Sequence, residues 1–309
     1  MKEFTFAIVT YNQRSLIVEH LESVKWQIEH YGQDYETDLV LSDDGSKDDT
    51  VAVAQKWIDQ HRHLFRNVKI LTAEKNQGIV PNYLKMVGQV ETAYFKPLAG
   101  DDYYYSNNVY EAAYGKDFVL TPTLQLFGSY VNRDQNRWLY KEYLFIPKNK
   151  LRHVVRKRLE YQLSLETPGV AWSTNLVDEG MYAALKEYQW IEDVPLWHYL
   201  LGKEIEVTLW EKPIVIYRMN TGISQNGKHE KFTVFDEEVL KLEREIQVHM
   251  NNKLYRYKRA IAKRIIKYFC SRWGAVHRFD EGMAKTLEEA DAYVATIAQA
   301  AQTWMKNNT

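Results

Sequence analysis

The chain lacks several features that would place it at once in a simple class. Its 309 residues include one cysteine, Cys270, so no disulfide can form within the chain. No stretch reaches the roughly 18 to 20 consecutive apolar residues of a membrane-spanning helix. The start, MKEFTFAIVT, has no basic region or cleavage site of a signal peptide. These absences predict a cytoplasmic protein whose contact with a membrane would be peripheral.

Net charge is also nearly absent. Lys and Arg number 40 and Asp and Glu number 41, which gives a formal net charge of −1. A chain so balanced has no overall field to concentrate a polyanion, so we expect no nucleic-acid partner. The balance averages two opposed regions, because residues 1–110 hold 16 acidic and 11 basic side chains, whereas residues 247–279 hold nine basic and no acidic ones.

The sequence also has no glycine-rich phosphate loop. Neither Gly-x-x-x-x-Gly-Lys-Ser/Thr nor Gly-x-Gly-x-x-Gly follows the first apolar run at residues 4–9. This excludes the P-loop and dinucleotide-binding fingerprints. Hydrophobic residues nevertheless make up 45% of the chain, so a folded core is expected.

What the first hundred residues do show is an alternation of β-rich runs and helical patterns. Such an alternation is typical of βαβ units and predicts an α/β fold with a mostly parallel sheet. The expected strands are 4–9, 37–41, 68–71 and 93–98. Further along, residues 172–201 read as mostly helical, 205–209 and 214–217 as short strands, and the chain from 236 onward as helical. We therefore predict a catalytic domain over 1–230 and a helical region over 231–309.

Acidic pairs follow two of the expected strands. Asp43 and Asp44 come after the second strand, and Asp101 and Asp102 after the fourth. Ligands of open α/β sheets bind beyond the carboxyl ends of the strands, so both pairs are expected at one edge. Adjacent carboxylates suit a hard divalent cation that keeps several waters. A helix cap and an ordinary surface turn are the alternatives.

These acidic pairs belong to an ordered set of motifs. The set comprises Ile-Val-Thr-Tyr-Asn at 8–12, Ser-Asp-Asp-Gly-Ser at 42–46, Asn-Gln-Gly-Ile at 76–79 with Asn82, Gly-Asp-Asp-Tyr at 100–103, and Glu-Asp at 192–193. Over residues 4–225 the chain resembles the family 2 glycosyltransferases, which have the Rossmann-like GT-A fold. Each motif is weak alone, but their shared order and spacing make the resemblance specific.

The resemblance implies a binding site for a nucleotide-sugar donor. Thr10, Tyr11 and Asn12 are expected beside the base. Asp44 is expected to accept an N–H of the base, with Asp43 nearby. The residues expected near the ribose and the donor sugar are Asn76, Gly78 and Asn82. Asp102 matches the metal position, with Asp101 beside it, and the expected cofactor is Mn²⁺ or Mg²⁺. The chain departs from the fullest pattern because Ala99-Gly100 replaces the frequent leading acid.

The resemblance also implies an inverting mechanism. Glu192 and Asp193 match the acidic pair that carries the catalytic base, and Asp193 would be that base. The alternative is that the pair caps a helix whose first turn holds Pro195. Arg218 would pair with the donor diphosphate, and the alternative is an ordinary surface arginine. Trp190 is the expected contact for an acceptor sugar because it lies close to the base, although aromatic residues at this density usually fill a core.

The predicted function is transfer of a sugar from a nucleoside diphosphate, UDP by expectation, to a saccharide or lipid-linked acceptor. A sugar-1-phosphate nucleotidyltransferase and an idle saccharide-binding domain are the alternatives. Residues 250–279 combine apolar positions at helical spacing with basic flanks. This pattern predicts either peripheral contact with the inner face of the plasma membrane or packing on the catalytic domain.

Overall fold

The computed structural model describes most of the chain. The described residues are 1–131, 150–160, 167–219, 221, 232–247, single residues between 254 and 264, and 278–308. Among them, no helix combines the length and the apolar composition that a bilayer crossing requires.

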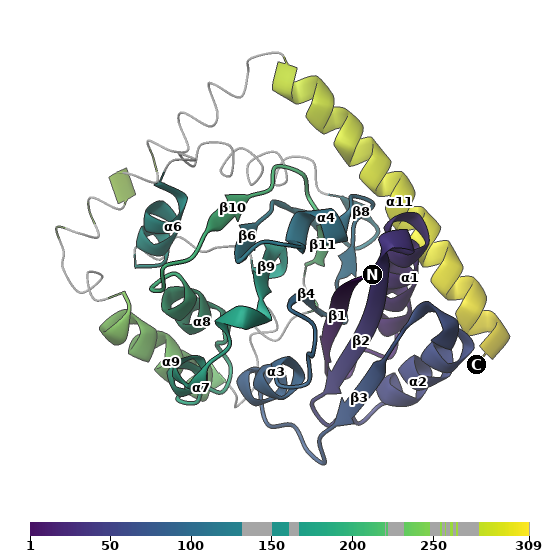
Figure 1. Ribbon diagram of the computed structural model, residues 1–309, viewed down its shortest axis with the longest axis horizontal. Coiled ribbons are helices and arrows are strands. Elements are labelled where there is room, and N and C mark those ends of the chain that lie inside the picture. The colour runs from purple at the N-terminus through teal and green to yellow at the C-terminus, as the bar shows by residue number, and fades with distance from the viewer. Residues whose placement is uncertain are drawn as a thin grey trace.

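A seven-stranded sheet forms the centre of the molecule (Figure 1). Its strands, in spatial order, are β10 (Val207–Leu209), β6 (Phe118–Leu120), β9 (Val170–Ser173), β4 (Tyr94–Ala99), β1 (Lys2–Thr10), β2 (Tyr35–Asp43) and β3 (Val68–Thr72). All neighbouring pairs are parallel except those of β9, which runs antiparallel to β4 and β6. The predicted α/β fold with a mostly parallel sheet is thus confirmed.

Helices cover both faces of this sheet because its central strands are apolar on both sides. Phe4, Phe6 and Ile8 of β1 face one core, and Ala7 faces the other. The first face carries α1 (Ile17–Tyr31), α2 (Thr50–Gln60) and α4 (Val109–Ala113). The second face carries α3 (Ile79–Val87), α6 (Leu151–Glu160), α7 (Glu179–Leu185), α8 (Asp193–Leu200) and α9 (Phe232–Glu245).

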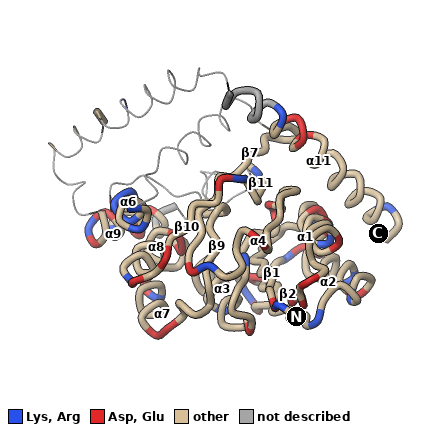
Figure 2. The backbone as a smooth tube through the Cα atoms, turned by 45° about the horizontal axis from the view of Figure 1, so that its top comes forward, with Lys and Arg blue, Asp and Glu red and all other residues tan. Residues whose placement is uncertain are grey.

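The basic segment at 150–160 forms helix α6. Its apolar residues Leu151, Val155 and Leu159 are buried. Arg156 and Lys157 keep 41% and 44% of their side chains exposed. In Figure 2 the Lys and Arg positions of α6 are seen near α8, which α6 contacts.

A second sheet of four strands lies beside the first. It consists, in spatial order, of β5 (Tyr103–Tyr104), β11 (Val215–Arg218), β7 (Thr123–Phe127) and β8 (Tyr130–Val131). The last helix, α11 (Arg278–Asn308), packs along α1 and against β8 (Figure 1). Its residues Leu287, Tyr293 and Ile297 share a core cluster with the second sheet. The carboxyl-terminal helix therefore packs on the amino-terminal half of the chain.

Most expected elements are found, with one clear difference. The four strands predicted in the first hundred residues are present. Three have slightly longer bounds, and β4 is shifted by one residue. The prediction that residues 172–201 are mostly helical is wrong at its start, because Val170–Ser173 forms β9 at the centre of the sheet.

Candidate functional site

Polar loops meet where β1, β2 and β4 end, which we call the carboxyl edge of the seven-stranded sheet. Thr10, the last residue of β1, lies opposite Asp43 of β2. The Asp44 amide donates to the Thr10 carbonyl at 3.0 Å, and the Gly100 amide donates to the Val9 carbonyl at 2.9 Å. The two acidic pairs predicted from the sequence are therefore brought to one edge.

Asn12 and Asp43 shape the first two loops. Asn12 has a φ of 52°, its amide donates to Ser46 Oγ at 2.8 Å, and its Oδ1 accepts from the Lys47 amide at 2.8 Å. Asp43 accepts from the Ser46 amide at 2.7 Å and from the Ser46 hydroxyl. These bonds tie the loop after β1 to the loop after β2, so both residues form the frame of the site.

Asp44 holds a third loop. Its carboxylate is 4% exposed and accepts the amides of Gln77 at 2.7 Å and Gly78 at 3.0 Å. The turn that follows Asp44 requires glycine at position 45. Gly45 has a φ of 71°, and a Cβ added there would lie 2.7 Å from the Lys75 backbone. The Asp-Asp-Gly-Ser motif thus packs directly against residues 75–78.

Gly78 begins helix α3 in a conformation that only glycine adopts readily. Its φ is 107°, and a Cβ would lie 2.5 Å from Gln189 Cγ and 2.6 Å from its carbonyl oxygen. Asn82, one turn into α3, exchanges two hydrogen bonds with Ser42, at 2.7 and 3.0 Å. Its side-chain amide therefore anchors α3 to β2 from a buried position.

Three buried polar atoms near these loops have no hydrogen-bond partner within the described part of the protein: Thr10 Oγ1, Gln13 Oε1 and Asn76 Nδ2. An unsatisfied buried polar atom costs roughly 1 to 3 kcal/mol, so such atoms need an explanation. Thr10 and Asn76 are both predicted to contact the nucleotide-sugar donor. Tyr11, between Thr10 and Asn12, is half-buried in the same loop.

The Asp101–Asp102 turn is packed tightly from behind. A Cβ on Gly100 would lie 2.7 Å from Gln13 Oε1 and 2.9 Å from Ile17, so no larger residue fits there without a shift. His20 of α1, fully buried, places Nδ1 2.7 Å from the Asp102 carbonyl oxygen, and burial lowers the pKa of this imidazole to about 4. The Asp102 carbonyl oxygen of this turn is thus bound by a neutral histidine.

The two carboxylates of this turn differ in their surroundings. Asp102 is 2% exposed and accepts the Arg218 amide at 2.7 Å. Burial and the neighbouring Asp101 raise the pKa of Asp102 well above its usual range, while the Arg218 amide and charge oppose this shift. Asp101 is 9% exposed and accepts from the Thr221 hydroxyl at 2.7 Å.

Arg218, the last residue of β11, lies against the same turn. Its Nε donates to the Asp101 carbonyl oxygen at 2.9 Å, and its Nη2 pairs with Glu19 of α1. The guanidinium also lies over the Tyr103 ring, 5.3 Å from the centroid. Arg218 therefore joins α1, β11 and the acidic turn.

Glu192 and Asp193 lie at the start of α8. The alternative prediction, that this pair caps a helix, requires the same position. Asp193 accepts the Val194 amide at 2.7 Å through Oδ1 and the Thr167 hydroxyl at 3.1 Å through Oδ2. Burial raises the pKa of both acids. The Asp193 charge raises that of Glu192 further, whereas the two hydrogen bonds to Asp193 counteract its rise. Asp193 is thus the member of the pair whose ionised form is favoured by its contacts.

The short 3-10 helix η4 (Thr167–Gly169) connects this acidic pair with strand β4. Thr167 binds Asp193, and the Pro168 carbonyl accepts from Lys96 Nζ at 2.8 Å. Lys96 is fully buried in β4. Burial lowers its pKa to about 7, and the Asp102 charge opposes this shift. Sequence reasoning missed Thr167 and Lys96, since neither lies in a recognisable motif.

Trp190 lies just before the acidic pair, but its side chain is 7% exposed and belongs to the core cluster of the second face. Its predicted contact with an acceptor is not tested by this placement and stays a prediction. Within the described residues, no group of three or more His, Cys, Asp or Glu side chains could surround a metal ion.

Comparisons with known proteins agree with this arrangement. The family model described as Glycosyl transferase family 2 matches residues 5–172. The structure of S. aureus TarS 1-349 in complex with UDP-GlcNAc matches with a TM-score of 0.51 and 18% identity, covering 79% of this chain and 67% of that one. S. aureus TarS 1-349 matches with a TM-score of 0.50 and 16% identity, covering 98% and 92% of the two chains. No curated protein matches.

Proposed function

We propose, from the premise that this chain belongs to glycosyl transferase family 2, that it transfers a sugar from a UDP-linked donor to a hydroxyl group with inversion at the anomeric carbon. The chain is a glycosyltransferase, and the GT-A-type fold predicted from the sequence is confirmed. The finer proposal rests on the loops after β1, β2 and β4, which meet at one edge, and on the short helix η4, which binds both the Asp193 carboxylate and Lys96 of β4.

The donor half of the proposal rests on the loops at 10–13, 43–46 and 76–78. Thr10 and Asn76 present buried polar atoms that have no partner among the described residues and that a nucleoside would satisfy. Tyr11, which follows Thr10 in the first loop, offers a ring for stacking on the base. Asp44 accepts the backbone amides of residues 77 and 78 and so fixes the third loop. The structural relative TarS binds UDP-GlcNAc, which favours UDP as the nucleotide.

The catalytic half assigns the base to Asp193. The acceptor hydroxyl oxygen forms a bond to the anomeric carbon from the face opposite the diphosphate, its proton passes to Asp193, and the bond between the anomeric carbon and the diphosphate oxygen breaks. One displacement inverts the centre. The Val194 amide and the Thr167 hydroxyl favour the ionised form that such a base needs.

Asp101 and Asp102 fit a divalent cation that takes few protein ligands. They are adjacent carboxylates, and no third acid or histidine within the described residues completes a cage. Mn²⁺ or Mg²⁺ held by such a pair would keep positions for water and phosphate oxygens and, when bound, would neutralise charge on the leaving diphosphate. The Asp101 carboxylate is the more exposed of the two, so we assign it the outer contact alongside Asp102.

Arg218 supports this turn in the proposal, and its predicted contact with the donor diphosphate stays a prediction. Its guanidinium is already engaged by Glu19 and by the Asp101 carbonyl oxygen. A saccharide, free or linked to lipid, is the proposed acceptor. The predicted membrane segment at 250–279 lies mostly outside the described residues, although Leu254, Tyr257 and Ile261 within it are exposed.

The test replaces the base and leaves the fold intact. In Asp193→Asn we expect transfer from a screened UDP-sugar to fall by about 10²- to 10⁴-fold, while UDP affinity measured by calorimetry stays within about twofold. Glu179→Gln is the matched control, because Glu179 holds the same first position in α7 and is exposed. Turnover of Asp193→Asn close to that of the control would remove Asp193 as the base.

A further inference from the structure

A carboxylate on helix α9 holds the loop that leads into the acidic pair. Glu238 is 7% exposed, and its two oxygens accept three successive backbone amides. The distances are 2.6 Å from Gln189, 3.0 Å from Trp190 and 3.1 Å from Ile191. The next two residues along the chain are Glu192 and Asp193.

Such an arrangement fixes a backbone more firmly than neutral hydrogen bonds would. A buried carboxylate that has lost its water is stable only when other donors replace that water. Here three amides do so, and hydrogen bonds to an ionised acceptor are about twice as strong as neutral ones. The direction of residues 189–191 therefore depends on the charge of Glu238.

Other residues on the same face of α9 reach the same loop. Glu245 accepts the Tyr188 hydroxyl at 3.2 Å, and Lys241 lies over the Tyr188 ring, 4.8 Å from its centroid. Leu242 of α9 is buried in the core that also contains α7 and α8. Because positions 238, 241, 242 and 245 share one side of a helix, α9 contacts the loop at several points along that side.

The loop is held from its other side by the donor region. The Gln189 carbonyl accepts the Val80 amide at 3.0 Å, and Gln189 Nε2 donates to the Gln77 carbonyl at 2.9 Å. The amide of Gln77 is in turn held by Asp44. One continuous set of contacts thus runs from Asp44, through Gln189, to the residue pair that begins α8.

We propose that Glu238 is a positioning residue for the transfer reaction, which places Asp193 relative to the donor loop by fixing residues 189–191. The inference rests on the proposed function. Glu238 touches neither reactant, so it acts through the backbone that it holds. A base displaced by about 1 Å loses on the order of 10²-fold in rate, which sets the scale of the expected effect.

Glu238→Gln is the decisive variant, because it keeps the size of the side chain. It removes the charge and turns one acceptor oxygen into an NH₂ group that faces amide donors. We expect kcat to fall at least tenfold, while UDP affinity and the donor KM change less than about threefold, since Asp44 and the loop at 76–78 remain. Hydrogen exchange of the amides of residues 189–191 should accelerate.

The control is Glu237→Gln, an exposed neighbour on the same helix that should leave kcat and exchange unchanged. Glu238→Asp keeps the charge on a shorter side chain and is measured in the same way if Glu238→Gln does not fold. An unchanged kcat, or a kcat loss no larger than the unfolded fraction measured by circular dichroism, would overturn the proposal. Slow exchange at 189–191 in Glu238→Gln would overturn it as well.

Asp193→Asn measured in parallel separates this inference from the proposed function. If Asp193→Asn is inactive and Glu238→Gln is fully active, the base assignment stands and the positioning role fails. If Asp193→Asn retains turnover, the proposed base fails whatever Glu238→Gln does.

Discussion

The two edges of the seven-stranded sheet treat charge in opposite ways. At the amino edge, where the strands begin, carboxylates are paired with Arg or Lys side chains. At the carboxyl edge and at the start of α8, within the described residues, the acids of the pairs Asp101–Asp102 and Glu192–Asp193 form no ion pair with Lys or Arg. Asp101, Asp102 and Asp193 are instead bound by amides and hydroxyl groups.

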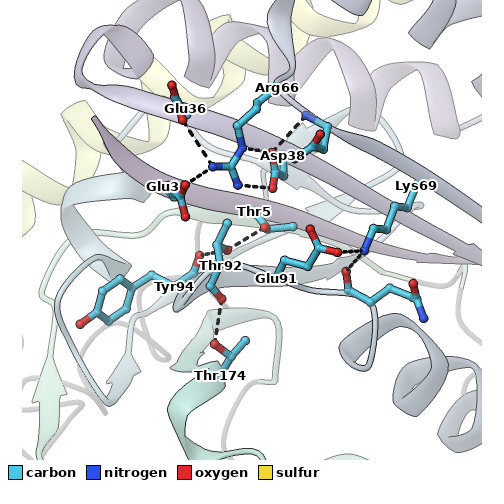
Figure 3. Close-up of polar contacts among 12 residues, drawn as sticks. Glu3, Thr5, Glu36, Asp38, Arg66, Lys69, Glu91, Thr92, Tyr94 and Thr174 are labelled. Carbon is cyan, nitrogen blue, oxygen red and sulfur yellow. Dashed lines mark hydrogen bonds and ion pairs between the residues drawn. The ribbon is translucent and has the colours of Figure 1, made fainter.

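Arg66 is the centre of the amino edge (Figure 3). It binds both oxygens of Asp38, at 2.9 and 2.7 Å, and it also reaches Glu3 and Glu36. These contacts join the starts of β1 and β2 to the chain just before β3. Each acid has an opposite charge nearby, which is the arrangement expected where only stability is at stake.

The carboxyl edge and the start of α8 keep their acids close together without a direct ion pair, although the charges of Arg218 and Lys96 lower the pKa of Asp102. Burial raises the pKa values of Asp102, Glu192 and Asp193, and a neighbouring acid adds to the rise for Asp102 and Glu192. Perturbed pKa values of this kind gather at functional sites, because a cation, a substrate or a proton in transit uses the charge. The comparison therefore separates an edge that holds its acids in ion pairs from the region to which we assign the proposed chemistry.

The largest effect that tests this contrast is expected from Asp101→Asn. If Asp101 provides the outer cation contact, its neutral replacement should lower transfer by about 10²-fold or more and weaken the response to manganese. The free energy of unfolding should change by less than about 1 kcal/mol, since Asn keeps an acceptor for Thr221. Rates measured across a manganese titration, with urea unfolding alongside, give both numbers.

An Asp101→Asn variant with wild-type rates at every manganese concentration would refute the cation assignment. Asp59→Asn is a suitable control, because Asp59 is an exposed acid on α2 that contacts only Gln55 among the described residues.

Arg66→Ala should give the reverse result at the amino edge. The substitution removes the side chain that binds both oxygens of Asp38, which is 6% exposed. We therefore expect a loss of about 1 to 3 kcal/mol in the free energy of unfolding. Activity per folded molecule should not change. Chemical denaturation followed by fluorescence, together with turnover normalised to folded protein, measures both effects.

Lys69→Met provides a matched comparison for Arg66→Ala. Lys69 pairs with Glu91 at 2.6 Å, but Glu91 is 63% exposed, so its loss should cost less than about 1 kcal/mol. A large loss of specific activity in either variant would show that the amino edge also serves catalysis.

Sequence reasoning predicted the carboxyl edge better than its supports. Asp44 and Asp102 could be placed together because the ends of parallel strands meet at one edge. The partner of Arg218 could not be predicted, since Glu19 lies 199 positions away and no local pattern links them. Glu238 was missed for a similar reason, because its partners are backbone amides, which any sequence supplies.

The middle of the chain was harder to predict for a different reason. Strand β9 (Val170–Ser173) is only four residues long and is buried on both sides, so it shows no alternation of polar and apolar residues. A short apolar run of this kind cannot be distinguished from a helix segment by its period. Its place between β4 and β6 is set by long-range pairing.

The smallest expected effect concerns the pH dependence of stability and Glu192. Because the pKa of Glu192 is raised in the folded state, the folded protein holds a proton there that the unfolded chain has released. The stabilisation is complete below the ordinary glutamate pKa and is lost as pH rises through the folded value. Glu192→Gln has no such proton to lose, so its stability relative to wild type should rise between about pH 5 and pH 8 by about 1 to 2 kcal/mol.

Urea unfolding of both proteins at several pH values measures this effect, because Asp102 and Lys96 titrate in both and largely cancel from the difference. Since the Asp193 charge raises the pKa of Glu192, the difference reports on this acidic pair. The direction distinguishes the two edges. Removing an acid from the amino edge, as in Asp38→Asn, takes away a partner of Arg66 and should destabilise at neutral pH, whereas removing Glu192 should stabilise. The free energies of unfolding of Glu192→Gln and wild type could instead differ by a constant amount at every pH. Glu192 would then be ionised in the folded state, and the contrast between the two edges would not extend to Glu192.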